Sequence, residues 1–233
     1  TNDTPFKGKF DGMFHEISGL TLGAGTSTEY VGLFGTTNGA TIMNVGLKNA
    51  DLSAVDYGGG LVGHAKGNTV ISAVYNEAGA TKIGKVNSSS IGASNIAGGI
   101  VGLLENSSLD NAYNTTNISG LGSAGLVGQF SGKSKIYAVY NTGDLNDGLA
   151  IFGALSADPD MFVKDAYTTK GSRIGSSDAN AHTYSAYGLN DTTTATQTTD
   201  SSKKGDAKQA ATYVGWDISD EGGANKTWRI FAG

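Results

Sequence analysis

A glycine-bounded tetrapeptide recurs along the first two thirds of this chain, and it limits the fold more than any other feature. Four copies consist of a glycine, two large apolar residues and a second glycine, while a fifth begins with alanine. The copies occupy 32–35 (GLFG), 60–63 (GLVG), 99–102 (GIVG), 125–128 (GLVG) and 150–153 (AIFG). Their starts are 28, 39, 26 and 25 residues apart. Self-similarity with a period of roughly 20–50 residues indicates a repeat architecture.

A second motif follows each tetrapeptide after about seven residues. Its copies are 42–47 (IMNVGL), 71–76 (ISAVYN), 109–114 (LDNAYN), 136–141 (IYAVYN) and 163–168 (VKDAYT). Both motifs are short apolar stretches bounded by Gly, Asn, Ser, Thr and Asp, which is typical of strands and turns. No apolar stripe with helical spacing extends over about 11 residues or more, so we predict no long helix.

One such unit cannot bury its own apolar face, whereas units stacked in register can. We therefore predict an all-β parallel β-helix (solenoid), in which equivalent residues stack about 4.8 Å apart. Loop insertions and capped ends complete the prediction. The glycines that flank each apolar pair are expected at tight bends or where neighbouring coils pack closely.

The repeats divide one predicted domain, 1–233, into successive parts. These are a first coil and cap (1–29), the repeats (30–170) with an insertion near 77–97, a polar loop (171–204) and a closing segment (205–233). Phe6, Phe10 and Phe14 are expected to cover the open end of the stack, because unpaired strand edges promote aggregation. The closing segment is expected to contain a short capped helical turn and two strands, at 213–218 and 227–231, whose tryptophans close the far end.

Stacking in register also predicts two rows of side chains. Asn76, Asn114 and Asn141 recur at one position and are expected to form a ladder. Tyrosines recur beside them and form an aromatic row: Tyr75, Tyr113, Tyr140 and Tyr167. We expect this row to stack for structural reasons. The alternative is a stripe that binds sugars or a protein, and these four tyrosines are our candidate ligand-binding residues.

Composition excludes several classes of protein. The chain has 36 glycines but only two prolines, whereas collagen needs abundant proline and a strict glycine triplet. The formal net charge is −5, and Arg173 and Arg229 are the only arginines, so we expect no nucleic-acid partner. Without cysteine the chain forms no disulfide, zinc–thiolate site or thiol nucleophile. No apolar run approaches the roughly 20 residues of a membrane helix. We therefore expect a soluble segment of a longer protein, without membrane insertion.

Motifs that carry chemistry are mostly missing. The glycines within 58–63 and 120–125 match the spacing of a dinucleotide-binding loop, but they belong to the repeat and no helix is predicted after them. Residues 144–148 resemble part of a calcium loop without its final glutamate, and we expect a turn there. The three histidines lack metal-ligand spacing, while a triad of distant Ser, His and Asp stays open. We predict no catalytic residue, no metal site and no cofactor.

The tetrapeptides at 60–63 and 125–128 resemble the GLUG motif. The similarity extends to the opening coil, 6–20, and to the segments 208–217 and 228–230, so it covers nearly the whole chain apart from the polar loop. Proteins with this motif include filamentous-haemagglutinin-like secreted bacterial adhesins and the non-catalytic part of bacterial immunoglobulin A proteases. The resemblance implies a right-handed parallel β-helix on the bacterial cell surface. The 39-residue step and the fifth tetrapeptide depart from the pattern.

We therefore expect a non-enzymatic segment of a secreted or cell-surface bacterial adhesin. It would attach to a host-cell or matrix receptor, or to a glycan, through many weak contacts, or serve as a rigid stalk. The candidate binding surfaces are the tyrosine row and the loops 79–96 and 171–204. The alternative is a carbohydrate-active β-helix enzyme acting on polysaccharide, because a fold does not determine a function.

Overall fold

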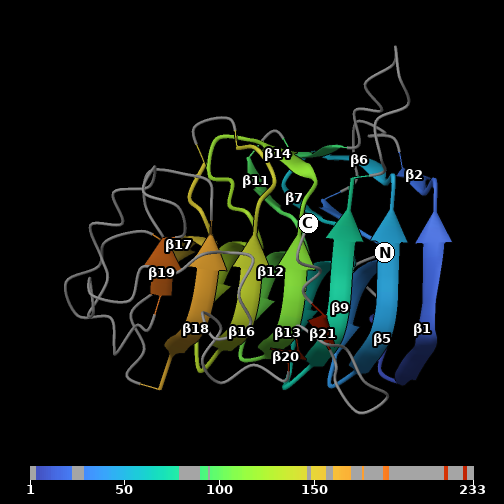
Figure 1. Ribbon diagram of the computed structural model, residues 1–233. Helices are drawn as coiled ribbons and strands as arrows, with labels where there is room; N and C mark the ends of the chain where they lie inside the picture. The colour runs from blue at the N-terminus through green and yellow to red at the C-terminus, as the bar shows by residue number, and fades with distance from the viewer. Residues whose placement is uncertain are drawn as a thin grey trace.

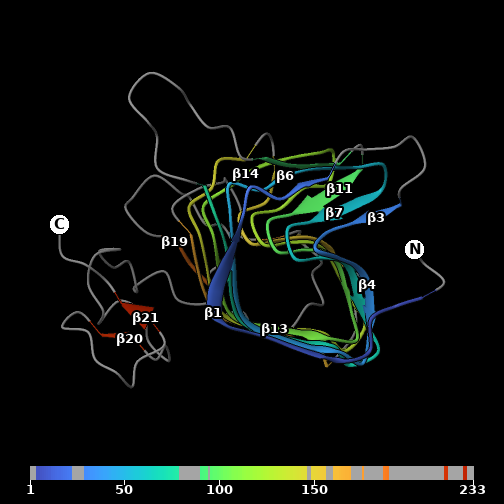
Figure 2. The same cartoon turned by 90° about the vertical axis from the view of Figure 1, so that its right-hand side faces the viewer.

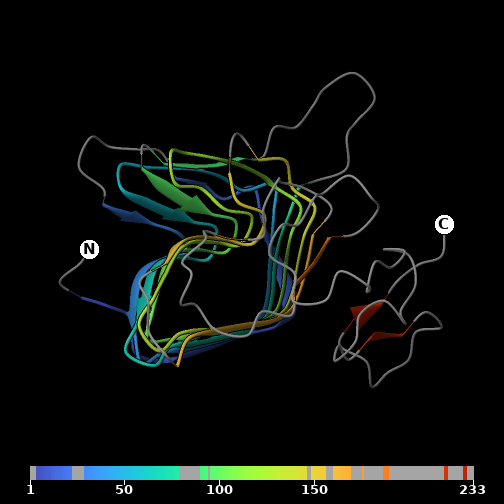
Figure 3. The same ribbon diagram turned by 90° about the vertical axis from the view of Figure 1, so that its left-hand side faces the viewer.

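The computed structural model describes the following parts of the chain: 4–22, 29–78, 90–93, 95–145, 148–155, 160–168, 175, 186–188, 218–219 and 228–229. Within these residues every regular secondary-structure element is a β-strand. The structure is an all-β parallel β-solenoid, as the repeat predicted, and it has about five coils. Figure 1 shows the strands of the widest sheet side by side, and Figures 2 and 3 look along the stack, where successive coils superimpose.

Four sheets run along the solenoid, and a complete coil, such as β7 to β10, contributes one strand to each of them. The seven-stranded sheet consists of β1 (Lys9–Ser18), β5 (Thr41–Lys48), β9 (Val70–Glu77), β13 (Ser108–Asn114), β16 (Lys135–Asn141), β18 (Phe162–Thr168) and β19 (Ala186–Gly188). The five-stranded sheet consists of β4 (Phe34–Asn38), β8 (Val62–Lys66), β12 (Val101–Glu105), β15 (Val127–Ser131) and β17 (Phe152–Leu155). The two narrower sheets are β3 (Tyr30–Val31), β7 (Tyr57–Gly59) and β11 (Ile96–Gly98), and β2 (Thr21–Leu22), β6 (Asp51–Ala54), β10 (Ser90–Ala93) and β14 (Asn117–Ser119).

The two sequence motifs occupy equivalent places in successive coils. The second apolar residue of each tetrapeptide pairs with its counterpart in the five-stranded sheet: Phe34, Val62, Val101, Val127 and Phe152. The first residue of each second motif pairs likewise in the seven-stranded sheet: Ile42, Ile71, Leu109, Ile136 and Val163. All of these except the partly buried first phenylalanine belong to one buried core. The predicted stacking of like residues over like is therefore confirmed, and it buries a continuous apolar column through the coils.

The first glycine of an internal tetrapeptide packs against the asparagine that ends the second motif. A Cβ atom at Gly60 would lie 2.8 Å from Nδ2 of Asn76, and one at Gly99 would lie 2.5 Å from Cγ of Asn114. The same two glycines also approach the backbone of the next coil, where a Cβ atom would lie 2.5 and 2.2 Å from a carbonyl oxygen. The two motifs thus recur together because the missing side chain of the glycine makes space for the asparagine side chain.

The three asparagines of the predicted ladder are fully buried and in register, and a side-chain hydrogen bond joins two of them, Asn114 and Asn141. Nδ2 of Asn114 donates to Oδ1 of Asn141 and to the carbonyl of Thr116, both at 2.9 Å, and the Thr116 amide donates to Oδ1 of Asn114 at 3.2 Å. Nδ2 of Asn76 donates to the carbonyl of Gly99 at 3.0 Å. Buried amides without partners are costly, so these bonds hold each coil in one register against the next.

Five consecutive strands of the seven-stranded sheet share a kink near their middle. At the kink one residue lies in the left-handed backbone region, with φ between 47° and 54°: Asn44, Ala73, Asn111, Ala138 and Asp165. Asparagine and aspartate adopt this conformation more readily than other non-glycine residues, whereas alanine has no preference for it. The residue pattern therefore did not predict the kink at the two alanines.

Replacing Ala73 by glycine is expected to raise the free energy of unfolding by about 0.5–1 kcal/mol, because the left-handed conformation strains alanine more than glycine's extra chain entropy costs. Urea denaturation followed by circular dichroism measures the change. The matched control is Ala65→Gly in β8, a buried alanine with ordinary backbone angles, which should lower stability instead. Destabilisation by both substitutions would contradict the assignment of strain to the kink.

The first coil covers the end of the core with two of the three predicted aromatic residues. The ring centroids of Phe6 and Phe10 lie 4.9 and 5.3 Å from that of Phe34. The expectation that Phe14 adds bulk to this cap is wrong, because its side chain is 75% exposed, beside Met13 at 70%. Both exposed residues have left-handed backbone angles, with φ of 62° and 49°, which break the in–out alternation of β1 at this point.

Several predicted segments fall wholly or partly outside the described residues. The extra residues of the long step lie between β9 and β10, and of these 79–89 are not described. Within the predicted polar loop, β19 extends the seven-stranded sheet by a strand. Two short strands, β20 (Ile218–Ser219) and β21 (Trp228–Arg229), occur where closing strands were predicted, and they pair with each other in parallel. The predicted helical turn lies outside the described residues, so closure of the far end stays a prediction.

Candidate functional site

The predicted tyrosine row lies on the outer face of the seven-stranded sheet. Side chains alternate across a strand, and the residues flanking each tyrosine, such as Val74 and Asn76, are buried in the core. Tyr75, Tyr113, Tyr140 and Tyr167 pair in register from β9 to β18. The register continues to Tyr187 in β19, which the sequence reasoning missed because that strand follows the last recognisable repeat.

Two tyrosines of the row, Tyr75 and Tyr113, contact each other through their ring faces. The rings of Tyr75 and Tyr113 are stacked, with centroids 4.9 Å apart and planes 4° apart. The Tyr75 ring also covers Gly46, since a Cβ atom there would lie 2.0 Å from its Cζ. Both faces of Tyr75 are therefore occupied, which favours the structural role, because sugars stack on exposed aromatic faces. Tyr167 is fully buried, with 1% of its side chain exposed, whereas Tyr75, Tyr113 and Tyr140 are partly exposed. A role of the row in ligand binding stays a prediction.

Burial keeps the phenols of Tyr75, Tyr113 and Tyr140 neutral at physiological pH. It is the main cause that raises the pKa of Tyr75 to about 12, and it also raises the pKa values of Tyr113 and Tyr140. The Tyr113 hydroxyl donates to Oε2 of Glu77 at 3.3 Å. The hydroxyls thus act as hydrogen-bond donors and not as phenolate bases.

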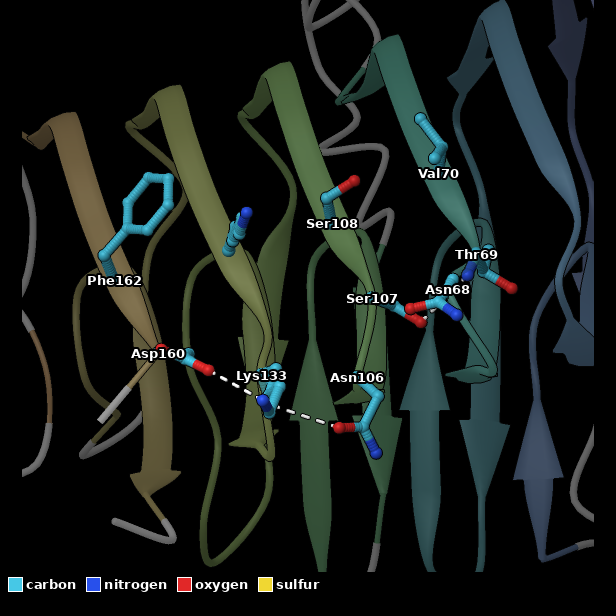
Figure 4. Close-up of a pocket in the computed structure, with 10 residues that line it drawn as sticks. Asn68, Thr69, Val70, Asn106, Ser107, Ser108, Lys133, Asp160 and Phe162 are labelled. Carbon is cyan, nitrogen blue, oxygen red and sulfur yellow. Dashed lines mark hydrogen bonds and ion pairs between the residues drawn. The ribbon is translucent and has the colours of Figure 1, made fainter. Parts of the chain in front are cut away.

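A groove of about 460 Å³ follows the corner where the five-stranded sheet passes into the seven-stranded sheet (Figure 4). It crosses four successive coils, and each coil contributes equivalent positions. Three residues before each second motif the lining residues are Asn68, Asn106, Lys133 and Asp160. One residue before each motif they are Val70, Ser108, Lys135 and Phe162. The sequence reasoning missed this groove, although the fixed offset from the second motif was a signal that could have revealed it.

The side chains at the C-terminal end of the groove are held by one another. Nζ of Lys133 lies 2.8 Å from Oδ2 of Asp160, and the Lys133 amide donates to Oδ1 of Asn106 at 3.1 Å (Figure 4). Nζ of Lys135 lies 5.6 Å from the centroid of the Phe162 ring, within the range of a cation–π contact. The groove therefore presents two ammonium groups and one carboxylate along a line of amides and hydroxyls.

A buried ladder of hydroxyl groups lies beneath these groups. The Thr69 amide donates to Oγ of Ser107, and the Ser107 amide donates to Oγ of Ser134, each at 3.1 Å. The hydroxyls of Thr37 and Thr69 lie 3.1 Å apart. Because these bonds link each coil to the next at the corner, the groove has a rigid base.

His64 forms the most buried ionisable contact of the five-stranded sheet. Its Nε2 lies 2.9 Å from Oε2 of Glu105, and its ring packs against Tyr30, with centroids 5.0 Å apart. Burial lowers the pKa of His64, against the opposite effects of Glu105 and Glu29, while Lys66 adds to the lowering. The imidazole is thus held in its neutral form.

Acidification from about pH 7.5 to about pH 5.5 is expected to lower the free energy of unfolding, and His64→Gln to remove part of that loss. The unfolded chain takes up this proton near pH 6.5, above the pKa of the folded state, so the stability is complete above pH 6.5 and declines below it. Urea midpoints at the two pH values measure the effect. His15→Gln, at an exposed position of β1, is the control and should leave the pH dependence unchanged. Equal pH dependence in wild type and His64→Gln would contradict this account.

The structure also shows the environment of the dinucleotide-like glycines and bears on the metal and membrane predictions. Gly60, just before β8, and Gly63, within β8, pack against the backbone of neighbouring coils, so they are repeat glycines as expected. Among the described residues, no group of three or more His, Cys, Asp or Glu is arranged to hold a metal ion. In the same part of the chain, no helix is long and apolar enough to cross a membrane.

Comparison with known proteins found no matching family model, no matching curated protein and no matching solved structure. The resemblance to the GLUG motif therefore depends on the residues of this chain alone.

Proposed function

We propose that this chain is a non-enzymatic attachment segment of a secreted or cell-surface bacterial adhesin. One observation carries the proposal: a groove on a rigid stack that presents equivalent positions once per coil over four coils. A repeating surface of this kind suits a repeating ligand, because several weak contacts to one chain add through effective concentration. A host-cell or matrix glycan is such a ligand.

The charges of the groove favour binding over hydrolysis. Glycoside hydrolysis commonly needs two carboxyl groups on either side of the scissile bond. The described lining of the groove has a single carboxylate, Asp160, and it is paired with Lys133. This argument supports the adhesin over the carbohydrate-active enzyme, which becomes an outcome of the test.

The resemblance to GLUG-motif adhesins supports the same proposal and adds two points to it. It favours a right-handed solenoid, and it favours a position outside the cell as part of a longer surface protein. The outward tyrosine row belongs to the proposed attachment surface as a stiffening element. The stacked rings of Tyr75 and Tyr113 join two neighbouring strands of this face, β9 and β13.

The test combines capture with turnover. The complete 233-residue chain, biotinylated at one end, is applied to a glycan array and to extracellular-matrix proteins, and the captured glycans are then incubated with the chain in a reducing-sugar assay. We expect capture without release of sugar. Release of sugar would replace the adhesin by the enzyme, and absence of capture on every surface would leave only a stalk and contradict attachment by this segment.

A further inference from the structure

We propose that the corner groove binds a linear polysaccharide that bears carboxylate groups, laid along the solenoid axis with about one sugar residue per coil. The inference rests on the proposed attachment function and assigns a ligand class and a binding direction to it. Three observations lead to it: the periodicity of the groove, its charge, and the hydrogen bonds that its backbone groups already make.

The periodicity selects an extended polymer that runs across the strands. Asn68, Asn106, Lys133 and Asp160 occupy one position in four successive coils, and neighbouring strands of a sheet lie about 4.8 Å apart. The rise per sugar of an extended polysaccharide is close to this spacing. Each sugar can therefore meet the side chains at the equivalent positions of one coil, with the amides of the two asparagines as donors and acceptors for hydroxyl groups.

The charge of the groove selects an acidic polymer. With two lysines and one aspartate, its lining has a net charge of +1, whereas the whole chain has −5. Lys135 makes no ion pair within the described residues and is held over the Phe162 ring. The pair of Lys133 and Asp160 is more than half exposed on both sides, and such pairs contribute about 0–1 kcal/mol. A ligand carboxylate can thus engage both ammonium groups at little cost to the protein.

The backbone of the corner disfavours an extended peptide as the ligand. Peptides that bind along a groove commonly use unpaired main-chain groups of a strand edge. Here the amides of the lining residues already bond from coil to coil: Asn68 donates to the Asn106 carbonyl at 2.8 Å, and Ser108 donates to the Thr69 carbonyl at 2.9 Å. Recognition is left to side chains, and these match the hydroxyl and carboxylate groups of a uronic-acid polymer.

Titration calorimetry of the complete chain with oligogalacturonates of increasing length tests the inference. Affinity is expected to increase with each added residue up to about four, because the groove crosses four coils, and then to level off. Neutral galacto-oligosaccharides of the same lengths should bind at least about tenfold more weakly, and added salt should weaken the acidic series. Equal affinity for the neutral series, or no length dependence, would overturn the inference.

A pair of matched variants locates the binding. Lys135→Met retains much of the side-chain length and should lower the affinity for oligogalacturonate at least about tenfold. Lys9→Met removes a lysine at the same register position of β1, outside the groove, and should leave the affinity unchanged. Urea midpoints confirm that both variants fold. Equal affinities of the two variants would overturn the site.

The outcomes also separate this inference from the proposed function. If the glycan array captures the chain through other glycans and Lys135→Met has no effect, the groove assignment is wrong and the attachment function stands. If neither the array nor the acidic oligomers bind the chain, both are wrong.

Discussion

Replacing Gly128 by alanine is expected to lower the free energy of unfolding by about 3 kcal/mol or more. The new Cβ atom would lie 2.5 Å from Cγ2 of Ile96, 2.8 Å from the carbonyl oxygen of Gly102 and 2.9 Å from the carbonyl carbon of Ala97. Two of these three atoms belong to the backbone of a neighbouring coil. They cannot move without shifting the strands that carry them, so side-chain rotation cannot relieve the clash.

The control uses the same motif position in the first coil. At Gly35 an added Cβ atom would meet only the Tyr30 carbonyl oxygen, at 3.4 Å, and the backbone φ is not in the left-handed region. Gly35→Ala should therefore change the free energy of unfolding by less than about 1 kcal/mol. Urea denaturation of the two variants measures the difference. If both are destabilised equally, the motif glycines serve backbone freedom and not close packing.

The contrast between Gly128 and Gly35 explains why the repeat could be recognised in the sequence. Close packing between coils demands glycine at the same place in each interior coil, and the period of the glycines therefore reports the period of the fold. The expectation of tight bends at these glycines found no support, because the described glycines with left-handed angles are others, such as Gly67 and Gly132. Left-handed residues instead lie at the corner before the seven-stranded sheet: Gly39, Gly67, Asn68, Asn106 and Gly132.

The features that escaped prediction share a physical cause. Ala73 and Ala138 sit at a left-handed kink imposed by the stacked strands around them, so tertiary packing overrides a local preference that alanine does not express. Phe14 was read as part of a cap from its size, but a similar backbone conformation places it in solvent. Local composition cannot report a conformation that neighbouring coils determine.

Part of the candidate site was likewise predicted from the sequence, and part was missed. The tyrosine row could be predicted because one residue type recurs at one position. The groove was missed because its equivalent positions hold different chemistry: amides in Asn68 and Asn106, an ammonium in Lys133 and a carboxylate in Asp160. Their fixed offset from the second motif places these residues in one line, but only the corner between two sheets makes that line concave.

Replacing Asn114 by alanine is expected to lower the free energy of unfolding by about 3–4 kcal/mol. The change removes three hydrogen bonds, leaves the amide of Thr116 without its Oδ1 partner, removes one of the two donors to Oδ1 of Asn141, and opens a void in a fully buried ladder. Each buried polar group left without a partner costs about 1–3 kcal/mol. Asn117→Ala, at an exposed position at the start of β14, should change stability by less than about 0.5 kcal/mol.

A second substitution separates the hydrogen bonds from the void. Asn114→Asp retains the shape of the side chain but replaces the donor Nδ2 by an acceptor that faces Oδ1 of Asn141. If the bonds hold the ladder together, this variant is also strongly destabilised near neutral pH, and acid partly restores its stability relative to wild type, because a protonated carboxyl regains one donor. Chemical denaturation at neutral pH and at about pH 4 measures both effects. A stable Asn114→Asp variant at neutral pH would show that the asparagines only fill space, and the ladder could not then fix the register of the coils.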